Sequence, residues 1–356
     1  MPELPLRQAG AGIRKKMHFD KSRVNKILII KPQAIGDVLL STPVIENMRH
    51  HFPDAEINFL TQSYCREVLM GNPYLNRVLT YDIAKGDGSF CLIKNIHNQK
   101  YDLIIDLFGN PRTAIILFNS DARYKVGYRF KWRALAYNIK VKPRGGEVHN
   151  VEFNLDALRA LNLEITSHKP KFYLNGVHKE FADEYFRQND LSGKQVIGFN
   201  PSGTWPTKVW NEEKWAELGK MFSKDSRIVL FWGYDKEKEL AERIRKAIGN
   251  SAVLIPEANL KYMAALIKKC SLFVTNDTGP MHVAWVSGVN TAAIFGPTNS
   301  NLQGPQSKNS LVIKNEELNC LGCNLTQLSE CPNQHKCMKE LSSVEVYTKL
   351  MEFMKL

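Results

Sequence analysis

The residues of this 356-residue chain that could do chemistry lie in three short polar segments, each set between a strand-like run and a helix-like run. The first segment, 31–43, contains Asp37 at the point where a predicted strand ends and a helix begins. A carboxylate in that position could act as the general base for a hydroxyl group. The spacing alone fits equally well an ordinary acidic residue that the helix dipole favours in a first turn.

The second segment, 200–210, follows the first predicted strand of the second half of the chain. It combines hydroxyl groups, a flexible glycine, aromatic rings and Lys208. A phosphate-binding loop needs such donors, and the Lys208 ammonium could neutralise the charge of a departing diphosphate. Segments of this composition are also common as simple surface turns.

The third segment, 275–282, runs from a buried strand into a helix N-terminus, where free backbone N–H groups and the helix dipole favour an anion. Asp277 and Thr278 could also do no more than cap that helix, and His282 could be a structural histidine. All three segments stand at corresponding strand ends. One functional site explains this shared position better than three unrelated turns do.

Alternating strand-like and helix-like runs predict an α/β protein with two doubly wound, Rossmann-like domains. Ligands of such folds bind at the carboxyl ends of strands, so the central cleft between the domains is the expected site. In the first half we expect a helix at about 37–51 and strands at 26–30, 56–61, 77–81, 102–108 and 125–128. In the second half we expect helices at 212–222, 236–248, 260–269 and 279–287, and strands at 196–200, 227–232, 252–255, 272–275 and 291–295.

The predicted domain organisation has five parts. They are a basic N-terminal arm that could be disordered (1–23), a first Rossmann-like domain (24–175), a linker region (176–194), a second Rossmann-like domain with a cysteine cluster (195–340) and a C-terminal helix (341–356).

Several classes of function lack their sequence signals. No G-x-G-x-x-G follows a strand, which argues against a dehydrogenase, and the P-loop pattern is absent. No Asp-x-Asp occurs, so the usual carboxylate clamp for a metal-bound nucleotide diphosphate is missing. The net charge of +12 favours polyanionic partners, but the basic residues are spread along the chain without a nucleic-acid-binding motif. We therefore expect no nucleic-acid partner.

Four of the seven cysteines fall in one segment after the last predicted strand: Cys320, Cys323, Cys331 and Cys337. A C-x-x-C pair followed by two more thiols has the character of a structural site for zinc or another thiolate-bound metal. Four reduced cysteines are the alternative, and stable disulfides are disfavoured in a cytoplasmic protein.

Four strings of residues resemble glycosyltransferase family 9, the ADP-heptose:lipopolysaccharide heptosyltransferases, in their order and spacing. They are Ile-Gly-Asp-Val-Leu-Leu-Ser-Thr-Pro (35–43), Trp-Pro-Thr-Lys-Val-Trp (205–210), Trp-Gly-Tyr-Asp-Lys-Glu (232–237) and Asn-Asp-Thr-Gly-Pro-Met-His (276–282). The match covers nearly the whole chain from Lys26 onward. The resemblance implies a GT-B fold whose first domain binds the acceptor and whose second domain binds the nucleotide sugar. It also implies an inverting transfer of heptose from an ADP-sugar without a catalytic metal.

The resemblance further implies roles for single residues. Asp37 matches the catalytic base, with Gln33, Ala34 and Gly36 in the loop on the acceptor side, and Lys208 matches the lysine on the donor phosphates. The implied donor contacts are Ser202, Gly203, Thr204, Glu237 (at the adenosine ribose), Asp277, Thr278, Gly279, Pro280, Met281 and His282.

Two alternatives stay open. A GT-B transferase with another nucleotide sugar or acceptor would carry the same strings, and so could a non-catalytic nucleotide-sugar-binding protein, although such a protein is expected to lose Asp37 or Lys208. No secretory signal or membrane-spanning run is visible, so we expect a cytoplasmic protein. Peripheral contact with the inner face of the bacterial inner membrane would suit a basic protein and an anionic lipopolysaccharide-core acceptor.

Overall fold

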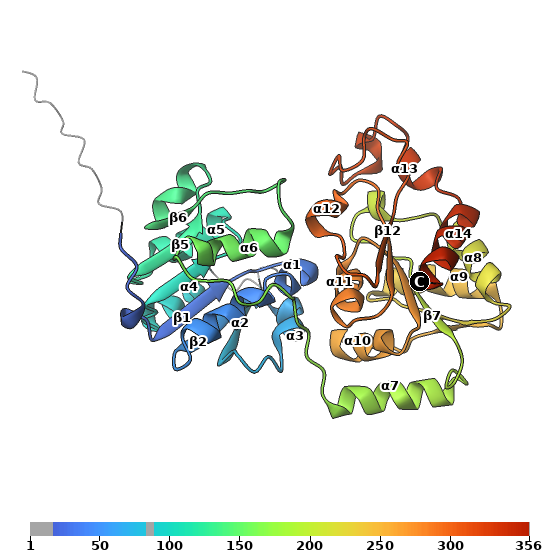
Figure 1. The fold of residues 1–356 in the computed structure, drawn as a ribbon, viewed down its shortest axis with the longest axis horizontal. Helices are drawn as coiled ribbons and strands as arrows, with labels where there is room; N and C mark the ends of the chain where they lie inside the picture. Colours follow the sequence, from blue (N-terminus) through green and yellow to red (C-terminus); the bar gives the residue numbers. More distant parts are fainter. Residues whose placement is uncertain (1–16, 83–88, 356) are drawn as a thin grey trace, which may run out of the picture.

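The computed structural model describes residues 17–82 and 89–355 as two α/β domains, with the N-terminal half of the chain at the left of Figure 1 and the C-terminal half at the right. Each domain contains a six-stranded parallel sheet. The strand orders are β3-β2-β1-β4-β5-β6 and β12-β11-β10-β7-β8-β9. Each order reverses next to its first strand, between β1 and β4 and between β7 and β10. Ligands of doubly wound sheets bind at such switch points.

The first domain has six strands and six α-helices in the described residues. The strands are β1 (Lys26–Ile30), β2 (Glu56–Gln62), β3 (Arg77–Tyr81), β4 (Leu103–Asp106), β5 (Tyr124–Tyr128) and β6 (Ile139–Val141). The helices are α1 (Ile35–Leu39), α2 (Thr42–His51), α3 (Arg66–Leu69), α4 (Ser89–Asn98), α5 (Pro111–Phe118) and α6 (Asn150–Arg159), with 3-10 turns η1 (Lys21–Arg23), η2 (Ser63–Cys65) and η3 (Lys131–Ala136).

The second half of the chain repeats this arrangement. Its strands are β7 (Val196–Asn200), β8 (Arg227–Leu230), β9 (Ala252–Leu254), β10 (Leu272–Asn276), β11 (Thr291–Ile294) and β12 (Ser310–Ile313). Its helices are α7 (Gly176–Gln188), α8 (Glu212–Phe222), α9 (Asp235–Ile248), α10 (Leu260–Lys268), α11 (Gly279–Val286), α12 (Ser300–Gln303), α13 (Lys336–Lys339) and α14 (Ser343–Met354), with 3-10 turns η4 (Pro206–Lys208) and η5 (Leu328–Glu330).

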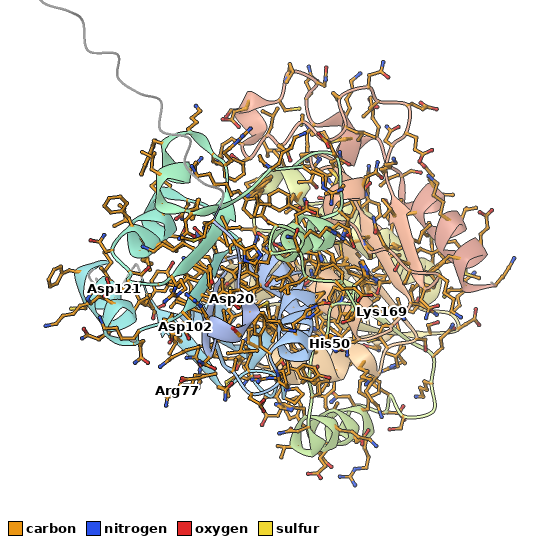
Figure 2. All side chains as sticks on the ribbon, turned by 60° about the vertical axis from the view of Figure 1, so that its left-hand side comes forward. Asp20, His50, Arg77, Asp102, Asp121 and Lys169 are labelled. Carbon is orange, nitrogen blue, oxygen red and sulfur yellow. The ribbon has the colours of Figure 1, made fainter. Side chains whose placement is uncertain are left out.

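The central strands are mostly apolar because helices cover both faces of each sheet, and polar residues such as Lys26, Asp106 and Asn200 stand at strand ends. In β1, Ile27 and Ile29 enter one hydrophobic core while Leu28 and Ile30 enter the other, and none of the four is exposed. The starts of β1 and β4 are joined by Asp102, which is labelled in Figure 2. Its Oδ2 accepts hydrogen bonds from the backbone N–H groups of Asn25 (2.9 Å) and Lys26 (3.0 Å). The predicted site loops follow the opposite, carboxyl ends of the strands, where ligands of such sheets bind.

The predicted helix at 37–51 is wrong in one respect, since the structure has two helices that are interrupted at Leu40 and Ser41. Pro43 stands in the first turn of α2, where a proline without an N–H group favours a new helix start. The sheet-edge strands β6 and β12 were not predicted. β6 has the exposed Lys140 at its centre and β12 is mostly only half-buried, so neither leaves a clear pattern of buried apolar residues.

The predicted N-terminal arm lies partly outside the described residues, which begin at Met17. The described part packs on the first domain, because the Phe19 ring contacts the rings of Phe52 and Tyr124 at centroid distances of 6.4 and 4.9 Å. The predicted linker consists mostly of α7, which packs against α10 of the second domain. Within the described residues, no helix is both long and apolar enough to cross a bilayer.

Candidate active site

Two glycines allow the two domains to meet at α1 and α11, which face each other in Figure 1. A Cβ atom at Gly36 would lie only 2.3 Å from His282 Cδ2 and 2.7 Å from its Nε2. A Cβ atom at Gly279 would lie 3.1 Å from Ile35 Cγ2. The contact joins the loop after β1 to the loop after β10, so the predicted acceptor-side and donor-side segments come together.

Asp37 stands in the first turn of α1, half-buried beside this contact. Its Oδ2 accepts a hydrogen bond from the backbone N–H of Ala34 at 3.3 Å, as expected of a residue near a helix start. The nearby Gln33 is exposed, and its Oε1 accepts a hydrogen bond from Gln62 Nε2 at 3.1 Å. Capping α1 uses one carboxylate oxygen of Asp37, and within the described residues Oδ1 is left for another partner.

His282 lies at the centre of the domain contact and is only 5% exposed. Burial lowers the pKa of His282 to about 4, although the carboxylates of Asp277 and Asp37 act in the opposite direction. The imidazole is therefore neutral at neutral pH. Its Nδ1 is buried and has no hydrogen-bond partner among the described residues. A buried polar atom of this kind suits a hydrogen bond to a bound ligand.

Lys208 and Asp277 form a buried ion pair between the other two predicted segments. Lys208 Nζ lies 2.6 Å from Asp277 Oδ2, and the two side chains are 13% and 4% exposed. The same Oδ2 accepts hydrogen bonds from Thr298 Oγ1 (2.7 Å) and Gln303 Nε2 (3.4 Å). Lys208 Nζ also lies 4.4 Å from the centre of the Trp205 ring. The ammonium group is thus held at one point in space.

Asparagine side chains join the Lys208 loop to the Asp277 loop. Asn276 Nδ2 donates to the carbonyl oxygens of Pro201 (2.8 Å) and Ser202 (3.2 Å), and Asn200 Nδ2 donates to Thr278 Oγ1 (3.0 Å). Thr278 is the N-cap residue of α11, but its side chain makes no capping hydrogen bond. Asp277 pairs with Lys208 instead. The interpretation that Asp277 and Thr278 only cap the helix is therefore wrong, and among the described residues no side chain caps the α11 N-terminus.

The cysteine-bearing segment, 320–337, also contacts the Lys208 loop. Thr207 Oγ1 donates to the carbonyl of Leu325 (2.7 Å), and His335 Nε2 lies 2.6 Å from the carbonyl oxygen of Thr207. His335 is only 8% exposed, and its backbone N–H donates to Cys331 Sγ at 3.3 Å. The segment therefore supports the loop that carries Lys208.

The four clustered cysteines lie near one another in the structure. Burial, together with a smaller effect of the neighbouring Cys320, Cys323 and Cys331, raises the pKa of the Cys337 thiol to about 11. Across the described ranges, no three His, Cys, Asp or Glu side chains are arranged to hold a metal ion. The structural metal site stays a prediction, which metal analysis of protein purified without chelator would test.

The other predicted donor residues differ in position. Ser202 is buried and its Oγ donates to Asn200 Oδ1, whereas Thr204 is exposed on the same loop beside Gly203. Glu237 lies apart in the first turn of α9 and accepts the backbone N–H of Gly233 at 2.7 Å.

In the first turn of α11, Pro280 is half-buried and has no N–H group to offer an anion. Met281 was predicted as a donor contact, but its side chain is fully buried in a small cluster with Ala293 and Phe295. Only its backbone can face a ligand.

Sequence reasoning missed several residues of this site. Thr298 and Gln303 contact Asp277 from the segment after β11, another polar stretch at a strand end. His149, at the start of α6, places Nε2 3.1 Å from the carbonyl oxygen of Gly304 in the second domain. The strand-end signal could have identified Thr298, whereas nothing local to His149 indicates a partner 155 positions away.

Comparison with known proteins places this geometry in a family. A family model described as glycosyltransferase family 9 (heptosyltransferase) matches residues 90–334, more than half of the chain. Lipooligosaccharide heptosyltransferase 2 of Campylobacter jejuni is 25% identical over 339 residues, which cover 93% of this chain and 98% of that protein. A solved glycosyl transferase family 9 structure from Veillonella parvula has a TM-score of 0.81 at 21% identity, covering 96% of this chain and 99% of its own.

The solved structure of the E. coli ADP-heptose LPS heptosyltransferase II has a TM-score of 0.75 at 22% identity, over 93% of this chain and 98% of its own. These likenesses confirm the predicted α/β fold of GT-B type, with two Rossmann-like domains. The family model confirms that the protein is a glycosyltransferase. The chain belongs to glycosyltransferase family 9, the heptosyltransferase family.

Proposed function

We propose that this protein transfers heptose from ADP-heptose to a lipopolysaccharide-core acceptor, with inversion and without a catalytic metal. One observation carries the proposal: the contact of Gly36 with His282 sets Asp37 of the first domain beside the uncapped α11 N-terminus of the second. A base and an anion site on opposite domains are what sugar transfer needs. The names of the relatives, lipooligosaccharide heptosyltransferase 2 and ADP-heptose LPS heptosyltransferase II, support the choice of sugar, nucleotide and acceptor.

In the proposed reaction, an acceptor hydroxyl oxygen attacks the anomeric carbon of the donor sugar while Asp37 takes the hydroxyl proton. The bond between the anomeric carbon and the diphosphate oxygen breaks, and its electron pair stays on the leaving ADP. Because the hydroxyl attacks from the face opposite to the diphosphate, the anomeric centre is inverted. Gln33 and Ala34 would line the acceptor side of this step.

The negative charge on the leaving diphosphate requires stabilisation at the second domain. Lys208 and the backbone N–H groups at the start of α11 would supply it, worth about 3 kcal/mol for each well-placed donor. Asp277 orients the Lys208 ammonium, and the unpaired Nδ1 of His282 would hydrogen-bond to the bound donor. Glu237, at the carboxyl end of β8, would bind the adenosine ribose once it releases Gly233.

A second candidate keeps the same site and changes the nucleotide sugar or the acceptor, since few side chains choose between related sugars. In either case we propose that the protein works in the cytoplasm, at the inner face of the membrane that carries the acceptor. The net charge of +12 supports contact with an anionic lipid surface.

The test is donor turnover, followed as ADP release from ADP-heptose with a heptose-deficient lipopolysaccharide acceptor, with and without EDTA. Asp37→Asn should lower kcat by at least about 100-fold and leave donor binding unchanged, because only proton transfer is lost. Asp54→Asn, an exposed aspartate elsewhere in the first domain, is the matched control and should behave as wild type.

The outcomes separate the parts of the proposal. Acceptor-dependent ADP release that resists EDTA would support a metal-independent transfer. Release that stops with EDTA and returns with added metal ions would overturn that part. Wild type that binds ADP without turning over this pair of substrates would favour another sugar or acceptor, and no binding of ADP would overturn the donor assignment.

A further inference from the structure

A patch of large exposed apolar side chains covers the outside of the first domain. The sheet face that contains Leu28 and Ile30 is covered by α4, α5 and η3, of which α5 contacts both of the others. Five side chains on the outer side of these elements are 43–76% exposed: Phe90, Ile115, Phe118, Trp132 and Leu135. We call these five residues the α4–α5 face.

The α4–α5 face arises because its elements are apolar on both sides. In α5, Ala114 and Leu117 enter the core while Ile115 and Phe118, three positions apart, point outward. An apolar groove separates α4 from α5, lined by Leu92, Ile93, Pro111, Arg112, Ile115 and Ile116. The other large exposed apolar side chains of the described residues each stand on a different element or loop: Met17, Tyr64, Met70, Val177, Tyr234, Leu328 and Val344. Isolated residues of that kind are ordinary, whereas a gathered patch marks an interaction surface.

The charge around this face is strongly positive. The stretch 89–142 contains ten lysines and arginines, three aspartates and no glutamate. Each aspartate is occupied: Asp102 accepts hydrogen bonds from backbone N–H groups, the buried Asp106 accepts a hydrogen bond from the Tyr137 hydroxyl, and Asp121 pairs with Lys100 at 2.7 Å. Asp102 and Asp121 are labelled in Figure 2. The exposed cations include Lys94, Arg129 and Lys131. Exposed apolar side chains together with exposed cations on the same part of the domain are complementary to an anionic lipid surface.

We propose that the α4–α5 face docks on an anionic bilayer, with its aromatic and aliphatic side chains in the headgroup region and its cations on lipid phosphates. Trp132 is suited to this position because its ring is apolar and its indole N–H can reach water or a headgroup. A second copy of this chain would bring the same cations face to face, so the charge disfavours a symmetric dimer here.

Docking at this face would also orient the site toward the membrane. α5 begins at Pro111, directly after β4, at the carboxyl edge of the sheet where the Asp37 loop follows β1. Lys31 Nζ donates to the carbonyl of Leu107 at 3.2 Å and joins these two strand ends. A lipid-borne acceptor would therefore meet the protein at the edge that carries Asp37. This step rests on the proposed function, whereas the docking itself does not.

The test is sedimentation of the full-length protein with vesicles of phosphatidylcholine, with and without 30% or so of phosphatidylglycerol, in the absence of donor and acceptor. Phe118→Ser with Leu135→Ser, and separately Lys94→Glu with Lys131→Glu, should each weaken binding to anionic vesicles by about tenfold. Binding of wild type should also fall at about 0.5 M salt. Circular dichroism checks that each variant is folded, which is expected because all four side chains are exposed.

Matched controls lie on the second domain. Val177→Ser with Val344→Ser removes two side chains of similar exposure, and Lys220→Glu with Lys224→Glu reverses two exposed charges. Both controls should bind vesicles as wild type does. The apolar variant should also keep its turnover of a water-soluble acceptor fragment and lose turnover of the same acceptor in vesicles.

Three results would overturn the proposal: equal binding of wild type to neutral and anionic vesicles, equal binding of all variants, or no vesicle binding at all. Light scattering that shows a wild-type dimer, abolished in Phe118→Ser with Leu135→Ser, would identify the face as a contact between copies instead. Vesicle binding without any turnover would leave docking supported and would count against the proposed function alone.

Discussion

At the scale of single residues, the buried pair of Lys208 and Asp277 has both a structural and a functional role. Lys208→Met leaves the Asp277 carboxylate, only 4% exposed, without its cation. Breaking a buried pair in this way should lower the free energy of unfolding by roughly 3 kcal/mol. Adding Asp277→Asn removes the unpaired charge, so the double variant should recover most of that stability. It should not recover turnover, because the leaving diphosphate still lacks the ammonium group.

Urea unfolding and ADP release measure the two effects separately. Thr298→Val, which removes one hydrogen bond to Asp277 and leaves the ion pair in place, is the matched control and should have a smaller effect on both. If Lys208→Met were as stable as wild type, the pair would have no structural role.

His282 makes stability depend on pH. Its folded-state pKa of about 4 lies below the value of 6.5 for the unfolded chain, and burial is the main cause. Between these values the unfolded chain binds a proton that the folded protein excludes, so stability is complete above pH 6.5 and falls as the pH drops to about 4. The expected loss is roughly 3 kcal/mol, at 1.36 kcal/mol for each pKa unit. Burial also lowers the pKa of His149, which acts in the same direction.

Thermal or urea unfolding from pH 7 to pH 4 would measure this dependence. His282→Gln keeps a polar side chain without the titration, so its stability should fall less over this range. An identical pH profile for wild type and His282→Gln would contradict the assignment to His282.

At the scale of elements, the approach of α1 to α11 depends on a missing side chain. In Gly36→Ala the new Cβ atom would overlap the His282 ring at 2.3 Å, so α1 and α11 must separate. Because Asp37 is next in the chain, we expect turnover to fall by about 100-fold, the effect of a misplacement of about 1 Å. Gly176→Ala serves as the control, because a Cβ atom there would meet no close neighbour. Gly146→Ala is unsuitable, because Gly146 has a φ of 91° that alanine rarely adopts. Steady-state kinetics would decide, and normal turnover in Gly36→Ala would show that the close approach is dispensable.

The cysteine-bearing segment should affect catalysis through the loop that it supports. His335→Ala removes the hydrogen bond to the Thr207 carbonyl, so the Lys208 loop should become less ordered. We expect the donor KM to rise by several-fold, because the lost hydrogen bond is worth on the order of 1 kcal/mol. The pH profile of turnover should change little.

His51→Ala is the matched control for this prediction. His51 Nε2 also lies 2.7 Å from a carbonyl oxygen, that of Glu164, but it is in the first domain and away from the Lys208 loop. It should change stability without changing the donor KM. Equal kinetic effects of the two substitutions would argue against a positioning role for His335.

At the scale of the whole molecule, a lysine of the second domain binds the first domain next to the connecting segment. Lys261 Nζ donates to the carbonyl oxygens of Met70 (2.8 Å) and Tyr173 (2.5 Å) and lies 4.2 Å from the centre of the Phe172 ring. Glu67 Oε2 accepts the backbone N–H of Leu260 at 2.7 Å in the same place. These contacts limit how far the domains can open.

Lys261→Met should keep the packing on Phe172 but lose both hydrogen bonds, at a cost of roughly 1–3 kcal/mol to the closed arrangement. Small-angle X-ray scattering of the free protein should then show a larger radius of gyration. Lys268→Met, at an exposed position of the same helix, should leave it unchanged. A radius of gyration unaffected by Lys261→Met would mean that other contacts hold the domains together.

The sequence by itself determined the two sheets and the three loops of the site. Strands covered on both faces are mostly apolar, so β1 and β7 stand out as apolar runs whose polar residues, Lys26 and Asn200, stand only at an end. The loops of Asp37, Lys208 and Asp277 are recognisable because each follows such a strand. Three of the four strings that resemble the family lie in these loops, the fourth (232–237) follows β8, and the family match confirms the resemblance.

Only the tertiary structure decided how these loops act together. It paired Lys208 with Asp277 rather than leaving Asp277 as a cap, buried Met281 in the core, and set His282 against Gly36. It also joined His335 to Thr207. Each of these contacts links residues far apart in the chain, or depends on which side of a helix meets the core. Local apolar patterns report burial along one segment, whereas the pairings within the second domain arise only when its loops pack together, and the contact of His282 with Gly36 only when the two domains meet.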